Sequence, residues 1–215
     1  MRIMSITILN NEADIIESFV RYNMTYLDKM IILDNGCTDN TILILKLLIQ
    51  EGYDIEIINE SKSEFEQFYL MNKYMQFISE RYKPDWIIPL DADEFLMCEK
   101  YSIRDYIKKL PRDRGYKVHW RQFVIKGDEN QEEDFVCRKF NYSVPHPVGK
   151  VFFPVEFFLT NDLILLAGQH DLNGKNLVIE NLPDMYMAHY PHRSFQQVQA
   201  KALCHSVRYI NYMNR

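Results

Sequence analysis

The chain has 215 residues, of which 47% are hydrophobic and 26% are charged, so its composition excludes a disordered or collagen-like protein. Its formal net charge of −5 disfavours a nucleic-acid-binding protein that depends on a broad basic face. No apolar run approaches the about 18 residues of a membrane-spanning helix, and residues 1–9 lack the features of a signal peptide. We expect one globular domain spanning 1–215.

Glycine and cysteine usage narrows the class of protein further. The seven glycines form neither the G-x-G-x-x-G of dinucleotide-binding proteins nor the phosphate-binding loop G-x-x-x-x-G-K-[ST]. The four cysteines are scattered and form no C-x-x-C pair, which is typical of reduced thiols in the cytosol. We expect a cytoplasmic protein without disulfides or a zinc knuckle.

The first ninety residues predict an alternation of strands and helices. Four short apolar runs predict buried strands, and helical spacing between them predicts three helices. The predicted strands are Ile3–Leu9, 30–33, 55–58 and 86–90, and the predicted helices are one that follows an N-cap at Asn11, Thr41–Gln50 with a cap at Thr38 or Asp39, and 65–82. This alternation is typical of a parallel sheet with crossover helices, so the predicted fold class is α/β with a Rossmann-like, mostly parallel sheet.

After residue 100 the pattern becomes richer in strands. The predicted elements are a short helix at 102–110 capped by Ser102, strands at 116–125, 135–142, 151–159 and 163–166, and a last helix at 194–212. With no internal repeat and no linker, we expect one domain with an α/β half at 1–100 and a mixed, β-rich half at 101–215. The chain ends at Arg215 without a helix stop signal, which is consistent with a fragment of a longer protein.

Polar clusters follow three of the predicted strands, at 10–12, 34–39 and 91–94. Because ligands of parallel sheets bind at the carboxyl ends of the strands, we expect these clusters to meet in one site. The sharpest feature is the D-x-D triplet of Asp91 and Asp93, whose carboxylates could both reach one hard divalent cation that takes its other ligands from a substrate diphosphate. The alternative interpretation is an acidic surface loop.

Three motifs in this order are similar to those of GT-A glycosyltransferases. Asn11-Glu12, then 34–41 (DNGCTDNT), then 91–95 (DADEF) resemble the NE, DNGSxDxT and DxDEF motifs of the family-two-like branch, with Cys37 in place of the usual serine. Weaker similarity continues through 149–150, 168–170 and 189–194. The resemblance implies a GT-A fold and a metal-dependent, inverting hexosyltransferase. It would move a sugar from a nucleotide-diphosphate donor, expected to be a UDP-sugar, to a saccharide or lipid-linked acceptor in surface polysaccharide biosynthesis.

The same resemblance implies roles in donor binding. Leu9, Asn10 and Glu12 would line the nucleoside pocket, and Asp34 would accept a hydrogen bond from the base. The other interpretation of Asp34 is a turn-forming residue before an Asn-Gly pair. Lys150 and Arg193 would offset the charge of the diphosphate, unless they are ordinary solvated side chains.

The resemblance also implies a set of metal ligands. Asp93 would be the principal ligand of Mn²⁺ or Mg²⁺, and Asp91 would bind the ribose, or the metal through a water. A late histidine often completes the metal shell in these enzymes; His189 matches best and His170 is the other candidate. The alternative for either histidine is a structural or surface residue.

The sequence leaves the catalytic base open. An inverting transfer needs a carboxylate that takes the proton of the acceptor hydroxyl. Asp171 is preferred, because it follows a predicted rim loop in the acceptor-side half. The other candidates are Glu94, Glu156 and the acidic run 132–134, which is also a plausible solvated loop.

Two other classes of protein stay open. A D-x-D phosphohydrolase of the haloacid-dehalogenase type would carry its Asp nucleophile after the first strand, whereas here the triplet follows the fourth. A non-catalytic sugar- or partner-binding module would be fully stable without metal and would turn over no donor. The segment 191–215 carries four Lys or Arg residues and no acids, so it either packs on its own domain or docks peripherally on the anionic inner face of a membrane.

Overall fold

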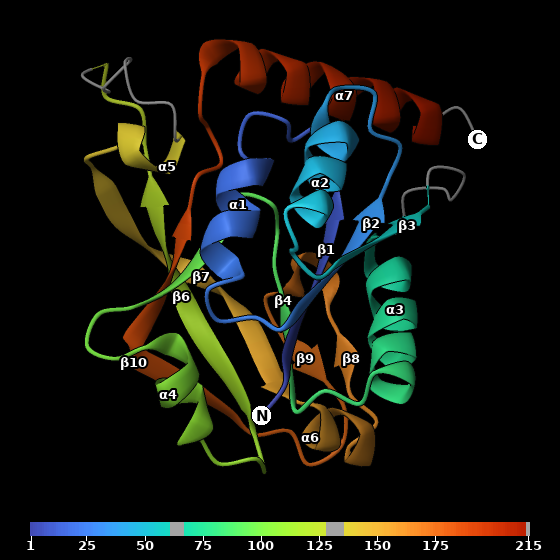
Figure 1. Ribbon diagram of the computed structural model, residues 1–215, viewed down its shortest axis with the longest axis vertical. Coiled ribbons are helices and arrows are strands. Elements are labelled where there is room, and N and C mark those ends of the chain that lie inside the picture. Colours follow the sequence, from blue (N-terminus) through green and yellow to red (C-terminus); the bar gives the residue numbers. More distant parts are fainter. Residues whose placement is uncertain (61–66, 128–135, 214–215) are drawn as a thin grey trace.

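The computed structural model describes residues 1–60, 67–127 and 136–213 (Figure 1). Within these residues, an eight-stranded sheet has the order β3-β2-β1-β4-β7-β6-β10-β5. Its strands are β1 (Ile3–Leu9), β2 (Lys29–Asp34), β3 (Ile55–Asn59), β4 (Trp86–Pro89), β5 (Glu94–Cys98), β6 (Gly115–Phe123), β7 (Ser143–Pro154) and β10 (Ile179–His189). The helices are α1 (Ile16–Asn23), α2 (Thr41–Gln50), α3 (Gln67–Arg81), α4 (Ile103–Lys108), α5 (Val136–Lys139), α6 (Val155–Thr160) and α7 (Phe195–Met213). A small second sheet pairs β8 (Ile164–Leu165) with β9 (Leu172–Asn173), with a 3₁₀ turn, η1 (Ala167–Gln169), between them.

The four strands predicted in the first half form the parallel part of the sheet. β1 pairs in parallel with β2 and with β4, and β2 pairs in parallel with β3. Alternate residues of β1 enter two separate cores: Ile3 packs with α1 and α2 on one face, while Met4 and Ile6 pack with α3 on the other. β1, β2 and β4 are buried along almost their whole length and are largely apolar, although β1 contains the buried Ser5 and Thr7. This is why short apolar runs located them.

The strand order reverses at β1. From β1 the chain builds outward through β2 and β3 on one side, and then returns to place β4 on the other side. The segments that follow β1 and β4 therefore leave the sheet in different directions, and this kind of switch point is where open α/β sheets bind ligands.

The second half extends this sheet with mixed strands. β7 is antiparallel to both β4 and β6, β10 is parallel to β6, and β5 is antiparallel to β10. The register of β10 against β5 places His189 opposite Glu94, so a residue near the end of the chain reaches the D-x-D loop. Gly149 allows β7 to approach β6 closely, since a Cβ there would lie 2.1 Å from the Val118 carbonyl oxygen.

One predicted strand of the second half is wrong, and another is correct only in its first four residues, 151–154. Residues 136–139 of the predicted strand 135–142 form α5, because Cys137 and Phe140 face the core with helical rather than alternating spacing. The predicted strand 151–159 stops at Pro154, whose missing N–H ends the ladder, and continues as α6. β5 and β10 were not predicted.

The cap at Asn11 is also wrong, whereas the cap at Ser102 is confirmed. Asn11 adopts a left-handed φ of 59°, its side-chain oxygen accepts from the Thr38 N–H at 2.7 Å, and α1 begins only at Ile16. Asp39 accepts from the Thr41 N–H at 3.0 Å, although Asn40 holds the N-cap position of α2. Ser102 accepts from the Asp105 N–H at 3.1 Å at the start of α4.

Helix α7 lies across the edge of the molecule where β1 and β2 end, along the top of Figure 1. It is the final helix predicted from the sequence, and its first turns pass above the segments that follow β1 and β4. Among the described residues, no helix is long and apolar enough to cross a membrane.

Candidate active site

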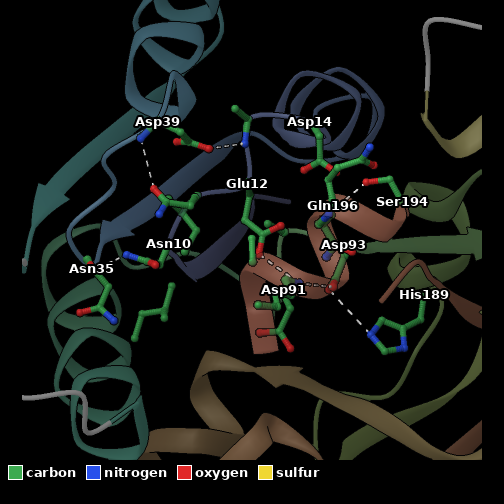
Figure 2. A pocket seen from close by; sticks show the side chains of 18 of the residues that line it. Asn10, Glu12, Asp14, Asn35, Asp39, Asp91, Asp93, His189, Ser194 and Gln196 are labelled. Atoms are coloured by element: carbon green, nitrogen blue, oxygen red, sulfur yellow. Dashed lines mark hydrogen bonds and ion pairs between the residues drawn. The ribbon is translucent and has the colours of Figure 1, made fainter. Parts of the chain in front are cut away.

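A cavity of about 710 Å³ opens at the switch point of the sheet (Figure 2). Three segments form its walls: the loop after β1, the D-x-D loop after β4, and the first turns of α7. Six residues with predicted site roles line it, namely Leu9, Asn10, Glu12, Asp91, Asp93 and His189. The other predicted site residues, Asp34, Glu94, Lys150, His170, Asp171 and Arg193, do not line it.

Asp91 lines the cavity and also contacts a group of buried side chains behind the cavity wall. The Lys150 ammonium lies 2.6 Å from Asp91 Oδ2 and 3.4 Å from Glu94 Oε2. Lys150 also donates to Gln169 Oε1 at 2.9 Å, and the Gln169 amide donates to Asp91 Oδ1 at 3.4 Å. We call Asp91, Glu94, Lys150, Gln169 and Trp120 the inner cluster. The side chain of Lys150 is only 1% exposed, so its charge is engaged within this cluster and does not face the cavity.

Glu94 is the most deeply buried carboxylate of the inner cluster. Its Oε2 accepts from the Asp91 backbone N–H at 2.9 Å, and its Oε1 accepts from the Trp120 indole N–H at 2.9 Å. Burial raises the pKa of Glu94 to about 8, while the Lys150 charge opposes that rise. Both carboxylate oxygens thus have partners that fix the turn of the D-x-D loop.

Gln169 is a member of this cluster that sequence reasoning missed. It is buried and has a left-handed φ of 62°, which is unfavourable for a residue other than glycine. The preceding Gly168 has a φ of 74°, and a Cβ there would lie 2.6 Å from the His170 ring. The only signal in the sequence was the weak similarity of 168–170 to the family motif; the strained turn itself places the amide on Asp91.

A second group of charges faces the cavity. Arg193 donates to Asp14 Oδ2 at 2.7 Å and to Glu12 Oε2 at 2.5 Å, and its Nη1 lies 3.6 Å from Asp93 Oδ2. We call Glu12, Asp14, Asp93, Arg193 and Lys201 the cavity cluster. The Arg193 side chain is 1% exposed, so in this structure it holds the three acidic residues together from behind.

Lys201 of α7 is the exposed cation of the cavity cluster. Its ammonium lies 3.2 Å from Glu12 Oε1 and 3.3 Å from Asp93 Oδ2, and its side chain is 37% exposed and lines the cavity. Burial raises the pKa of Glu12. Burial would also raise the pKa of Asp93, but Lys201, His189 and Arg193 lower it below its usual value. Asp93 is therefore ionised at neutral pH.

His189 approaches Asp93 from β10, and Figure 2 shows the two side chains turned toward each other. The distance from His189 Nε2 to Asp93 Oδ1 is 3.8 Å. The imidazole stacks on Trp120 at a centroid distance of 4.1 Å, and burial lowers the pKa of His189 to about 4. The ring is thus neutral at physiological pH and can offer a lone pair to a metal ion.

The described residues contain no group of three or more His, Cys, Asp or Glu side chains arranged to hold a metal ion. The donor set that does fit is smaller: one oxygen of Asp93 and Nε2 of His189. Two protein ligands suit a Mn²⁺ or Mg²⁺ ion that takes the rest of its shell from substrate phosphates and water. Asp91 is engaged with Lys150, so in this structure its carboxylate is not a free ligand.

The remaining described candidates for metal ligand or catalytic base do not line the cavity. His170 Nδ1 contacts the Gly149 carbonyl oxygen at 2.8 Å and its ring meets Trp120 edge-on. The half-exposed carboxylate of Asp171 pairs with Lys117 at 3.4 Å. Glu156 lies in the first turn of α6, which is at the opposite end of the molecule from α7 in Figure 1. The run 132–134 lies outside the described residues.

Asp34 shows the turn contact that the alternative interpretation expected. Its Oδ1 accepts from the Cys37 N–H at 2.8 Å, which holds the turn after β2. Nearby, Asn10 donates to the carbonyl oxygens of Asn35 and Gly36 at 2.8 and 3.0 Å. The ends of β1 and β2 are thereby joined into one wall.

No family model and no curated protein sequence matches the chain. Among solved structures, it is similar to S. aureus TarS 1–349, with a TM-score of 0.58, 12% identity, and coverage of 94% of this chain and 65% of that one. It is also similar to GalNAc-T7 solved with UDP, GalNAc and Mn²⁺, with a TM-score of 0.54, 13% identity, and coverage of 91% and 44%. A mannosyltransferase of Pyrobaculum calidifontis, solved with GDP-Man and Mn²⁺, matches with 15% identity over 54% of this chain and 35% of that one, at a TM-score of 0.42.

These similarities establish the fold. The mixed α/β architecture, with its curled, mostly parallel sheet and flanking helices, is that of the GT-A glycosyltransferases. The chain spans less than two thirds of the length of each of these structures.

Proposed function

We propose that the chain is a metal-dependent glycosyltransferase that takes a sugar from a nucleotide-diphosphate donor. The observation that carries this proposal is the cavity at the switch point of a GT-A sheet, with Asp93 and His189 side by side on its wall. TarS and GalNAc-T7 support it as relatives in fold, and GalNAc-T7 was solved with UDP, GalNAc and Mn²⁺.

In this proposal the cavity is divided between nucleoside and diphosphate. Leu9, Asn10 and Asp34 serve the nucleoside end, where the loops after β1 and β2 meet. Asp93 and His189 hold a Mn²⁺ or Mg²⁺ ion, which when bound offsets the charge that develops on the diphosphate leaving group. The neutral imidazole of His189 and the ionised carboxylate of Asp93 are the protonation states that such an ion requires.

The role of Asp91 in this proposal follows from its partners. Lys150 and Gln169 fix its carboxylate at the cavity wall, where it would contact the ribose, or the metal through a water. Lys150 and Arg193 then act on the donor indirectly, because both hold carboxylates of the site from behind. For the catalytic base we retain Asp171, whose half-exposed carboxylate is more accessible than the fully buried Glu94.

The proposal also covers the donor, the type of transfer, the acceptor and the cellular location. We infer a UDP-sugar donor, an inverting hexosyl transfer, and a saccharide or lipid-linked acceptor of surface polysaccharide biosynthesis at the cytoplasmic face of the inner membrane. The segment 191–215 would supply a peripheral membrane contact. Two of its basic residues, Arg193 and Lys201, contact carboxylates of the cavity cluster, so such a contact would depend on the rest of the segment.

The testing experiment is a thermal-shift titration of UDP and GDP, each in Mn²⁺ and in EDTA. We expect the nucleotide to raise the melting temperature in Mn²⁺ only, because Asp93 and His189 would hold the ion that offsets the charge of the diphosphate. Asp93→Asn removes a charged oxygen ligand while keeping the shape, so it should abolish the Mn²⁺-dependent part of the shift. Asp162→Asn, an exposed carboxylate remote from the cavity, is the matched control and should behave as the wild type.

Equal stabilisation in EDTA and Mn²⁺ would show that no metal bridges the diphosphate. A protein that binds nucleotide with Mn²⁺ but neither hydrolyses nor transfers any nucleotide sugar would be the non-catalytic binding module instead.

A further inference from the structure

Three cations surround the D-x-D loop, and they differ in what they can reach. Lys150 and Arg193 are each 1% exposed, and their charges are paired with the carboxylates of Asp91 and of Glu12 and Asp14. Lys201 is 37% exposed. Among the described residues that line the cavity, Lys201 is the one that carries a permanent positive charge. An anionic ligand in this cavity would therefore meet Lys201 before either of the other two.

We propose that Lys201 binds the diphosphate of the donor directly. This assignment rests on the proposed function and adds a residue to it. The Lys201 ammonium has three donors, and the structure directs it toward Glu12 and Asp93. A phosphate oxygen in the cavity would be an additional or replacement partner for the same ammonium.

The Lys201 ammonium can move to a phosphate without leaving Glu12 or Asp93 as an unpaired buried charge. Glu12 keeps its contact with Arg193 at 2.5 Å, and Asp93 keeps the Arg193 guanidinium at 3.6 Å. The usual penalty for breaking a buried ion pair, an uncompensated charge, is thereby avoided. Glu12 and Asp93 hold the ammonium at the cavity wall when no donor is bound.

The position of Lys201 also links donor binding to α7. Ser194, Gln196, Gln197 and Ala200 line the same cavity, so the first two turns of α7 form one wall of it. A phosphate that engages Lys201 would be held between this wall and the D-x-D loop. We therefore expect α7 to be protected in the complex with donor.

A rival role for Lys201 follows from the same contacts. Its ammonium lies against Asp93, which is the carboxylate proposed to hold the metal ion, so Lys201 could instead block that ion. The two roles predict opposite effects of removing the charge. A phosphate ligand predicts weaker nucleotide binding in Lys201→Met, whereas a blocking residue predicts tighter binding of both Mn²⁺ and nucleotide.

The experiment compares the wild type with Lys201→Met, Lys201→Arg and Lys175→Met. Lys175 pairs with Asp162 at the surface, and its replacement removes the same charge away from the cavity. Calorimetric titration measures UDP and GDP in saturating Mn²⁺, and ligand-observed NMR measures uridine and guanosine, which lack phosphates. Electron paramagnetic resonance of Mn²⁺ measures metal binding without nucleotide.

We expect Lys201→Met to weaken the diphosphate that the wild type binds by about tenfold or more, because a charged hydrogen bond to phosphate is lost. The nucleoside should bind within twofold of the wild type. Lys201→Arg should recover most of the affinity, and Lys175→Met should change nothing. Hydrogen exchange of α7 should slow on nucleotide binding in the wild type but not in Lys201→Met.

Three results would overturn the assignment. Diphosphate affinity within twofold of the wild type in Lys201→Met would show that no phosphate contact exists. An equal loss for nucleoside and diphosphate would show a structural role. Tighter Mn²⁺ and nucleotide binding would show the blocking role. If the wild type bound no nucleoside diphosphate at all, the proposed function itself would fail, which is a distinct outcome from these three.

Discussion

The inner cluster and the cavity cluster meet at the D-x-D loop, but their lysines differ in access to solvent. In the inner cluster, Lys150 is buried and every charged group has a partner. In the cavity cluster, Lys201 is partly exposed and the carboxylates of Glu12 and Asp93 line an open cavity. The comparison indicates that the first cluster fixes the loop and the second is available to a ligand.

The spacing of the D-x-D triplet explains how one loop serves both clusters. The turn sends Asp91 to Lys150 and Asp93 to His189, so its two carboxylates have different partners. From the sequence alone, the carboxylates of both Asp91 and Asp93 were predicted to be able to reach one cation. Among the described residues, Asp93 lies 3.8 Å from the His189 imidazole, whereas Asp91 is paired with Lys150.

The largest effect should come from the inner cluster. Lys150→Met leaves the Asp91 carboxylate without its cation, and removing one partner of a buried ion pair costs about 3–5 kcal/mol. Urea denaturation should therefore show a loss of that size in the free energy of unfolding. Lys175→Met, at an exposed pair, should cost less than about 1 kcal/mol. A loss in Lys150→Met as small as that of the control would show that the inner cluster does not fix the loop.

A second effect should appear in the pH dependence of stability. Burial lowers the pKa of His189 to about 4, against 6.5 in the unfolded chain. As the pH falls below 6.5, the unfolded state gains a proton that the folded state does not bind, so stability is lost progressively until about pH 4. The shift corresponds to about 3 kcal/mol.

The measurement is the free energy of unfolding in EDTA between pH 7 and 4, for the wild type and for His189→Phe. The difference between the two proteins isolates His189, because Glu94, whose raised pKa acts in the opposite direction, is common to both. His189→Phe should lose less stability on acidification than the wild type. Parallel curves would show that His189 titrates normally and is not held neutral beside Asp93.

The two clusters also show what could be predicted from the sequence. The apolar runs located β1 to β4, since strands covered on both faces are largely hydrophobic. β10 was missed because Pro183 and neighbouring polar residues interrupt it, and its pairing with β6 is irregular between Asn181 and Tyr186. Without β10 the sequence could suggest His189 only by family resemblance.

The site residues likewise differ in whether a local sequence pattern could locate them. Asp91 and Asp93 were predictable because their place at a strand end follows from local pattern. Lys201 and Gln169 were not, because their roles depend on how α7 packs over the cavity and on a left-handed turn. Tertiary packing decides such contacts, and no spacing rule within one element reports it. Arg193 was predicted as a phosphate ligand, yet its neighbours place it behind Glu12 and Asp14.

The smallest expected effect concerns Asp34, at the outer edge of the site. Its Oδ1 accepts the Cys37 N–H, which leaves Oδ2 as the oxygen that would accept from the base of a bound nucleotide. Asp34→Asn can keep the turn through its amide oxygen, but it places an NH₂ group where Oδ2 was. UDP binding should therefore weaken by about 1–3 kcal/mol while the melting temperature of the free protein changes little. Asp34→Ala should lower both, because it also removes the acceptor for Cys37. A thermal melt of each free variant and a separate UDP titration distinguish the two interpretations. If Asp34→Asn binds UDP as tightly as the wild type, Asp34 is a turn residue alone. The base is then recognised elsewhere on the wall that Asn10 builds between β1 and β2.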